Sequence, residues 1–394
     1  MVECKGRTSQ RGQILTPSHT TTSLSGAWPG LAIAELRWWT EETFRSSEAE
    51  WQDLLARSDA DPLFMSWAWQ WLWWRHHAGL LKSRLYLIAA YTRDGQLVGL
   101  APFHLHRAAH RKPLSAMRLE IIGSTWRDAT GAFSEYLDFV VDRRFEDVFL
   151  ESLAHFVMRR HDWSDVVLAN SKRDSVAARF VHQHLRSICY IREVDPLVAQ
   201  LTLLPQSFDN YVQTLNSGVR RKVWRQRTKL VGTQLSVVTR ERVGEVFNLF
   251  NHFHEKRWGR TLFRDSLLDF HTEFALLCAD RGALRMSILS VAGSPISAIY
   301  DVRIGKVEYN IQCGFDTSLG GISPGYLHFG FSMEAACRDG VSVYDFLAGD
   351  GRTRNYKSDF NTRLTELVTF QCLRGPLAWL YKAYDRRTPA STAA

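Results

Sequence analysis

This chain of 394 residues has no apolar run long enough to cross a membrane, since a spanning helix needs about 20 apolar residues. Its first residues lack the charged, apolar and small-residue order of a signal peptide. Its six cysteines are scattered and include no C-x-x-C pair, which predicts reduced thiols and no structural zinc or other metal. We therefore expect a cytoplasmic protein without integral membrane insertion.

The chain also lacks a G-x-S-x-G nucleophile elbow and any short-period repeat. Without such an elbow, no covalent serine intermediate is expected in the chemistry of this chain. Charge of one sign is not extreme either. The formal net charge of +8 is modest for this length, so it favours anionic ligands such as nucleotides and phosphates without selecting one.

The patterning that is present predicts an α/β (α+β) chain with mixed, mostly antiparallel sheets flanked by helices. In the first half, "DPLFMSWAWQWLWWRHH" reads as a helix whose five Trp residues favour core packing over sugar or membrane contact. Two β-rich runs meet at Asp94-Gly95, which is a hairpin signal. In the second half, a helix broken near Gly218 and two amphipathic helices precede a three-stranded meander, a helix and two strands, "VSVYDFLAG" and "LTELVTFQCL".

Both halves place a hairpin ahead of an α-then-β unit, which predicts a divergent tandem repeat of one α/β module. The predicted modules cover residues 31–202 and 203–376. Residues 1–30 and 377–394 are rich in small and polar residues at their ends and are predicted to be tails.

A glycine-rich loop, "GISPGYLHFG", leads into the helix between the meander and "VSVYDFLAG". The first N–H groups of a helix lack internal partners and carry positive dipole charge, so the N-terminus of this helix, its mouth, can bind a phosphate. Gly321, Ser323, Gly325 and Tyr326 are the predicted cofactor-binding residues. The alternative is an ordinary helix start, with Ser323 as N-cap and Pro324 in the first turn.

Three stretches carry a resemblance to a known family: "LFNHFHEKRWG", the basic segment "NSGVRRKVWRQRTKL", and the long run from "YNIQCGFDTSLGGISPGY" to "YDFLAGDGRTRNYKSDF". They resemble the GNAT acyltransferase superfamily, in the branch that holds CelD-like proteins of cellulose and exopolysaccharide loci and the Fem-type peptidoglycan transferases. The resemblance spans residues 31–374 and rests on order and spacing. It implies tandem GNAT-like modules and transfer of an acyl group, usually from coenzyme A, to an amine or hydroxyl.

The loop departs from the family's pyrophosphate motif, Arg/Gln-x-x-Gly-x-Gly/Ala. Gly320 stands where Arg or Gln is expected and Ser323 where the middle glycine is expected, whereas Gly325 matches. Fem-type proteins carry similar departures and use aminoacyl-tRNA. The donor is therefore expected to be acetyl-CoA or another acyl-CoA, with aminoacyl-tRNA as the alternative.

Acyl transfer needs a base for the acceptor and an acid or positive field for the leaving thiolate. "YDFLAGDGRTRNYKSDF" supplies Asp350 as a base, Tyr356 as an acid and Lys357 as a cation, and these are the predicted catalytic residues. The spacing from Asp350 to Tyr356 and Lys357 resembles a pattern of the CelD-like family, although the insertion "GRTRN" makes it longer here than is common in the family. Asp350-Gly351 could instead be a turn and Lys357 a surface lysine. Asp345 is a further possible base, unless its side chain faces solvent.

The predicted substrate-binding residues are Arg221, Arg225 and Trp258. Arg221, Arg225 and Lys229 would share one helix face and could hold an anionic substrate, a sugar phosphate or tRNA, or could form a solvated face. Trp258 could line the acceptor pocket or simply pack.

Taken together, the resemblance implies an acyl-CoA-dependent N- or O-acyltransferase, such as an acetyltransferase, in exopolysaccharide or cellulose-type polymer assembly. Its expected partners are a small-molecule or saccharide acceptor and polysaccharide synthesis machinery. The alternatives are Fem-like aminoacyl transfer from tRNA and a non-catalytic adaptor in a polysaccharide synthesis complex.

Overall fold

The computed structural model describes residues 22–23, 32–110, 114–127, 132–228, 230, 232–319, 321–349 and 356–387. Within these ranges, none of the helices is both long and apolar enough to cross a bilayer. The predicted N-terminal tail lies outside the description, apart from two residues that pair with β2.

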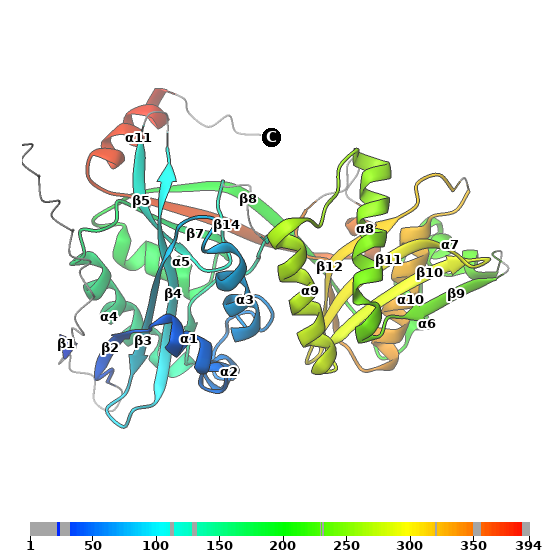
Figure 1. Cartoon of the computed structure of the whole chain (residues 1–394), viewed down its shortest axis with the longest axis horizontal. Coiled ribbons are helices and arrows are strands. Elements are labelled where there is room, and N and C mark those ends of the chain that lie inside the picture. The colour runs from blue at the N-terminus through cyan, green and yellow to red at the C-terminus, as the bar shows by residue number, and fades with distance from the viewer. Residues whose placement is uncertain are drawn as a thin grey trace, which may run out of the picture.

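One sheet of 14 strands runs through the described chain (Figure 1). Its strands are β1 (Thr22–Ser23), β2 (Glu35–Trp38), β3 (Arg84–Tyr91), β4 (Leu97–Ala109), β5 (Ser115–Ile121), β6 (Val140–Val141), β7 (Asp165–Lys172), β8 (Tyr190–Leu203), β9 (Thr233–Val237), β10 (Leu284–Val291), β11 (Ser294–Ile304), β12 (Val307–Phe315), β13 (Val343–Asp345) and β14 (Arg363–Leu373). Their spatial order is β1-β2-β3-β4-β5-β7-β14-β8-β13-β12-β11-β10-β9, with β6 on β4.

Helices cover both faces of this sheet. They are α1 (Glu41–Ser46), α2 (Glu48–Ala56), α3 (Trp67–His77), α4 (Glu146–Met158), α5 (Val176–Phe180), α6 (Phe208–Thr214), α7 (Ser217–Val223), α8 (Val243–Trp258), α9 (Asp265–Asp280), α10 (Pro324–Arg338) and α11 (Gly375–Arg387). Shorter helical segments are η1 (Arg143–Phe145), η2 (Val181–Leu185), η3 (Arg225–Thr228), η4 (Arg240–Arg242) and η5 (Lys357–Phe360).

Pairing is antiparallel except at β5·β7 and β12·β13, so the predicted fold class is confirmed. Each parallel pair is aligned over three residues of each strand. The chain passes from one strand of the pair to the other through a helix, α4 in the first half and α10 in the second. The two halves therefore repeat one arrangement, an antiparallel meander followed by a parallel strand reached through a helix.

In the second half, α8 and α9 cover one face of the meander and α10 covers the other. Tyr300 packs on Phe247 of α8, with ring centroids 5.8 Å apart, whereas its neighbour Ile299 clusters with Phe329 of α10. Successive strand residues point to opposite faces, so this alternation places one helical layer on each side.

The Trp-rich helix α3 packs in the core, as its spacing predicts. Ser66 accepts the Trp69 amide at its start, and four of its five Trp side chains are buried. Trp69 also meets two rings of α9, Phe270 at 4.9 Å and Phe274 at 4.8 Å. This aromatic contact joins the two halves in one continuous core.

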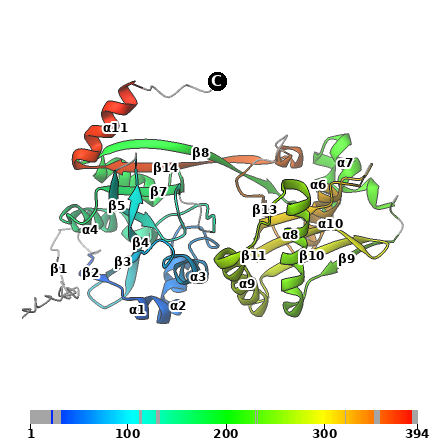
Figure 2. The same ribbon diagram turned by 45° about the horizontal axis from the view of Figure 1, so that its top comes forward.

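The long strands β8 and β14 bridge the halves (Figure 2). β14 lies between β7 and β8, although it comes almost last in the chain, and the end of β8 pairs with β13. Because both strands run through both halves, the predicted division into modules stays a prediction.

Three local expectations are corrected by the structure. The basic helical segment breaks at Leu215 and Asn216, close to the predicted break near Gly218, but it breaks a second time at Trp224. "EYLDFVV" provides only the two residues of β6. Residues 377–387, predicted as tail, belong to α11, which docks Tyr381 against His110.

Candidate active site

A cavity of about 390 Å³ lies where β12 and β13 part. The two strands pair only from Val307–Tyr309 to Val343–Asp345, after which β12 continues to Phe315 and the other chain segment turns away. Both halves line the cavity, with Trp69 and Glu135 from the first and Cys313, Tyr356 and Lys357 from the second. A mostly preformed concave site at a break in the sheet is a common place for a ligand.

The turn after β13 forms one wall of this cavity and is held in an unusual backbone conformation. Leu347 has a φ of 60°, in the left-handed region, at a cost on the order of 1 kcal/mol for a non-glycine residue. Lys357 donates from Nζ to the carbonyls of Leu347 (2.8 Å) and Ala348 (2.6 Å), and Glu135 Oε2 accepts the Ala348 amide at 2.7 Å. These three bonds hold the turn from both halves of the chain.

Lys357 is therefore a buried lysine that lines the cavity, and not a surface lysine. Its ammonium is already bound to two carbonyl oxygens, which suits a residue that positions the turn. Its predicted part in the chemistry stays a prediction.

Two buried carboxylates, Asp345 and Glu135, each accept a backbone amide of this turn. Asp345 accepts from Tyr136 Oη at 2.9 Å and from the Leu347 amide at 2.8 Å, so its side chain does not face solvent. Burial raises the pKa of Asp345 to about 6. Burial also raises the pKa of Glu135 to about 8, and the negative charge of Asp345 adds to that rise.

A third carboxylate, Asp61, lies behind this pair. It accepts from Tyr309 Oη at 3.0 Å and from the amides of Leu63 and Phe64, and burial raises its pKa. Three acids brought together by both halves create a negative potential in the interior, which disfavours their simultaneous ionisation.

Tyr356 supplies a hydroxyl to the same cavity. Its Oη lies 3.6 Å from Cys313 Sγ, and its ring lies against Phe329. Burial raises the pKa of Tyr356 well above its ordinary value, so the phenol keeps its proton and can donate a hydrogen bond. The location fits the predicted acid, and the role itself stays a prediction.

The predicted phosphate-binding mouth lies at the start of α10. Ser323 occupies the N-cap position, but its side chain makes no capping bond. Instead Gln226 reaches over from η3, accepting from the Ser323 amide at 3.2 Å and donating to the Gly321 carbonyl at 3.3 Å. Gly321 has a φ of 77°, which a glycine adopts without strain.

Gly325 and Tyr326 are more closely packed than the sequence suggests. A Cβ on Gly325 would lie 3.1 Å from the ring of Phe315, so this position needs a very small residue. Tyr326 donates to Asp359 at 2.6 Å and lies under Lys222 Nζ. The four predicted cofactor-binding residues therefore share one helix start, and their contact with a donor stays a prediction.

Arg257 is a cation near this mouth that sequence reasoning missed. Its guanidinium lies 5.2 Å from the centre of the Phe315 ring, the same ring that covers Gly325. The neighbouring Trp258 stacks on His254 and is 43% exposed, and it does not line the cavity.

The other predicted residues are less informative. Arg221 and Arg225 are exposed, but the break at Trp224 places them on α7 and η3, so they do not share one continuous helix face. Lys229 and the predicted base Asp350 lie outside the described residues.

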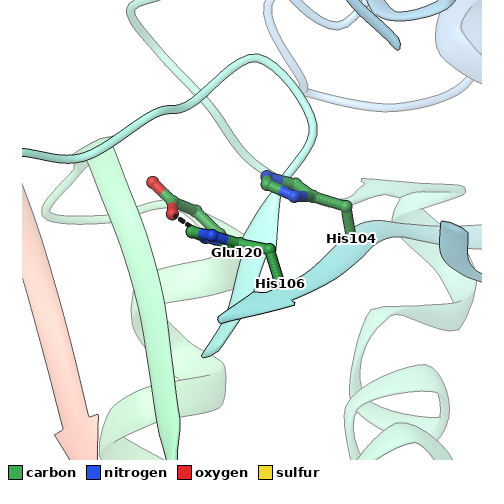
Figure 3. Close-up of side chains that lie close together, drawn as sticks. All are labelled: His104, His106 and Glu120. Carbon is green, nitrogen blue, oxygen red and sulfur yellow. Dashed lines mark hydrogen bonds and ion pairs between the residues drawn. The ribbon is translucent and has the colours of Figure 1, made fainter. Parts of the chain in front are cut away.

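Within the described chain, one cluster could supply three metal ligands: His104, His106 and Glu120, with ligand atoms within 4.8 Å of one another. Figure 3 shows the two imidazoles, which stack 18° from parallel, with Glu120 bound to His106 at 3.1 Å. Glu120 also accepts from Ser124 Oγ and the Trp126 amide. Stacked rings do not aim their lone pairs at one point, so the cluster fits a polar network best, and the predicted absence of a metal stays a prediction.

This network occupies the first half's counterpart of the cavity. Glu120 is the last β5 residue paired with β7, at the point where these parallel strands part. Trp126 closes the opening by packing on Val167 and Ala169 of β7. The gap where β5 and β7 part is therefore filled by side chains of the protein itself. The corresponding gap in the second half, where β12 and β13 part, holds the cavity.

Sequence reasoning missed Glu135 and Asp61, the two acids that the first half contributes. Each follows or precedes aromatic and apolar residues without a recognisable motif. Only the docking of the two halves brings them to the end of β13, so no local signal in the sequence identifies them.

Residues 217–358 match the family model described as an acetyltransferase (GNAT) domain. Comparison with the curated proteins gave no match. Among solved structures, the crystal structure of FemX aligns with a TM-score of 0.59 and 14% identity, covering 88% of this chain and 99% of that one. A conserved protein of unknown function from Bacteroides thetaiotaomicron VPI-5482 gives 0.52 and 13%, covering 86% and 99%. A tandem GNAT protein from the clavulanic acid biosynthesis pathway gives 0.47 and 12%, covering 87% and 99%.

The matched domain contains β12, α10 and β13, the elements that frame the cavity and the helix mouth. The likeness to FemX extends over nearly the whole chain and shows a shared fold. The family match over residues 217–358 supports a GNAT-type acyltransferase.

Proposed function

We propose that this chain transfers an acyl group from acyl-CoA to an amine held in the cavity between its halves. The observation that carries the proposal is the buried pair of Glu135 and Asp345 at the point where β12 and β13 part. A pair of buried acids attracts a cationic ammonium more strongly than a neutral hydroxyl. The coenzyme A pyrophosphate would lie at the α10 mouth, near Ser323, Gly325 and Arg257.

Glu135 is the proposed general base, because its carboxyl lines the cavity and a base works best with a pKa near the working pH. It takes a proton from the ammonium, and the neutral amine then attacks the thioester carbonyl. A C–N bond forms and the C–S bond breaks. The nitrogen loses its second proton, which passes through the Tyr356 hydroxyl to the departing thiolate, so Tyr356 ends protonated. Lys357 positions the turn that carries the Ala348 amide. Asp350 stays a candidate base beside Glu135.

The acceptor pathway is a finer proposal. Exopolysaccharide or cellulose-type polymer assembly is supported by the resemblance to CelD-like proteins alone. An amino sugar would satisfy both that pathway and the preference of the cavity for an amine.

The first test is calorimetric titration of acetyl-CoA into the purified chain and into Ser323→Trp. Ser323 is half-buried and its side chain makes no capping bond, so a bulky residue blocks the mouth without removing a known contact. Ser342→Trp, at an exposed position between α10 and β13, is the control for adding a bulky residue away from the start of α10. Binding that is lost only in Ser323→Trp supports the donor site, whereas no binding of acetyl-CoA or longer acyl-CoAs rejects coenzyme A.

Aminoacyl transfer from tRNA is the second candidate, favoured by the FemX likeness and by the exposed cations Arg221 and Arg225. Each phosphate contact makes binding steeply salt-dependent. Tight tRNA binding that weakens in Arg221→Ala/Arg225→Ala and in salt would favour this donor. Unchanged polymer production with Glu135→Gln and Lys357→Ala would instead favour a non-catalytic adaptor.

A further inference from the structure

The C-terminal helix α11 stands at the outer edge of the first half in both overall views (Figures 1 and 2). Its inner face makes hydrogen bonds and ion pairs to residues of the first half. Tyr381, its one buried residue, bonds His110 at 3.1 Å, and Asp385 accepts from Tyr190 (3.0 Å) and Arg192 (2.6 Å). The helix therefore has a fixed orientation.

The outer face of α11 combines one large aromatic residue with cations. Trp379 is 78% exposed, the largest exposed fraction of any large apolar side chain in the described ranges. At about 100° per residue, Arg386 lies within roughly 20° of Trp379 around the helix, and Lys382 and Arg387 lie to either side. All three cations are exposed, and the only acid of the helix, Asp385, points inward to Arg192.

We propose that this face, which we call the α11 face (Trp379, Leu380, Lys382, Arg386 and Arg387), binds reversibly to an anionic lipid bilayer surface. An amphipathic helix with Trp and Leu among basic residues lies in the membrane interface, where the indole enters the headgroup layer and the cations meet lipid phosphates. A second copy of the chain fits the face poorly, because a symmetric contact would place the two sets of cations against each other.

The test is co-sedimentation of the full chain with vesicles of phosphatidylcholine alone and with one third phosphatidylglycerol. We expect binding to the anionic vesicles only, weakened by salt. Trp379→Ala and Arg386→Ala/Arg387→Ala should both reduce it, the latter by about fivefold for each cation removed. Leu364→Ala, a comparably exposed apolar position on β14, and Arg338→Ala on α10 are matched controls and should bind as the wild type does.

Three outcomes would overturn the proposal: no binding to anionic vesicles at low salt, equal binding to neutral vesicles, or equal loss in the control variants. A change of molecular mass in gel filtration for Trp379→Ala, with vesicle binding intact, would assign the α11 face to a contact between copies instead. Because Trp379 is exposed, its removal leaves the fold unchanged, which a thermal melt of each variant checks.

Discussion

Replacing Glu135 with Gln should weaken activity and strengthen the fold, and the second effect should depend on pH. The pKa of this carboxyl rises from an ordinary 4.5 to about 8 in the folded chain. Between these pH values the folded protein holds a proton that the unfolded chain has lost, so the free energy of unfolding falls as pH rises. At pH 9 the pKa difference corresponds to an upper limit on the order of 5 kcal/mol, at roughly 1.4 kcal/mol for each tenfold change.

A glutamine at this position cannot ionise and can still accept the Ala348 amide, so the variant should escape most of this loss. We expect Glu135→Gln to match the wild type at pH 5 and to exceed its stability by about 1–3 kcal/mol at pH 9, after neighbouring groups adjust. Urea denaturation at pH 5, 7 and 9 measures this. Glu151→Gln, on the exposed side of α4, is the matched control for replacing a carboxyl, and its stability should stay within about 0.5 kcal/mol of the wild type.

The same variant separates two roles of the carboxyl. As the base that removes the amine proton, Glu135 should contribute about 10²–10⁴ in rate, and the rise of wild-type activity towards pH 8 should vanish with it. A variant that is less stable at pH 9 would refute the reasoning about burial. Full activity together with the expected stabilisation would show that Glu135 is not the base, and Asp350 would then be the preferred candidate.

Three further predictions concern Lys357, Gly330 and Trp126. Lys357→Met should lower the free energy of unfolding by about 2–4 kcal/mol in urea denaturation, since two buried carbonyls lose a charged donor. It should also move the pH optimum of transferase activity upward, because loss of the ammonium raises the pKa of Glu135. An unchanged optimum would argue against coupling between Lys357 and Glu135. Gly330→Ala should cost about 1–3 kcal/mol, because its Cβ would lie 2.4 Å from the Val223 carbonyl, whereas Gly244→Ala in open space should not destabilise α8. Trp126→Ala should cost about 3–5 kcal/mol by emptying the filled gap where β5 and β7 part, yet leave acetyl-CoA binding unchanged in calorimetry.

The sequence predicts elements whose signals are local. Asp94-Gly95 lies at a turn with positive φ at the glycine, and the Trp spacing of α3 correctly predicts core packing. The predicted order of meander, helix and strand is also correct, since α10 follows β12 and precedes β13. These features depend on a few neighbouring residues, so periodicity and turn chemistry reveal them.

The candidate site is less predictable because its chemistry depends on contacts between distant segments. Glu135 meets Ala348 across 213 positions of the chain, and neither carries a motif. The loop that resembles a phosphate site is bound by Gln226, which lies in η3, in a segment predicted to be an ordinary helix. The pKa values of the carboxyls depend on burial, which the sequence does not report.

The position of β14 has a consequence for the order of folding during synthesis. The first half cannot complete its sheet until residues 363–373 have been made, because β14 separates β7 from β8. Until then β7 and β8 have an open gap between them and present unpaired edges, the state in which strands most readily pair with the wrong partner. A nascent chain of this kind must wait for residues 363–373, so a truncation that removes β14 would take a strand out of the middle of the 14-stranded sheet.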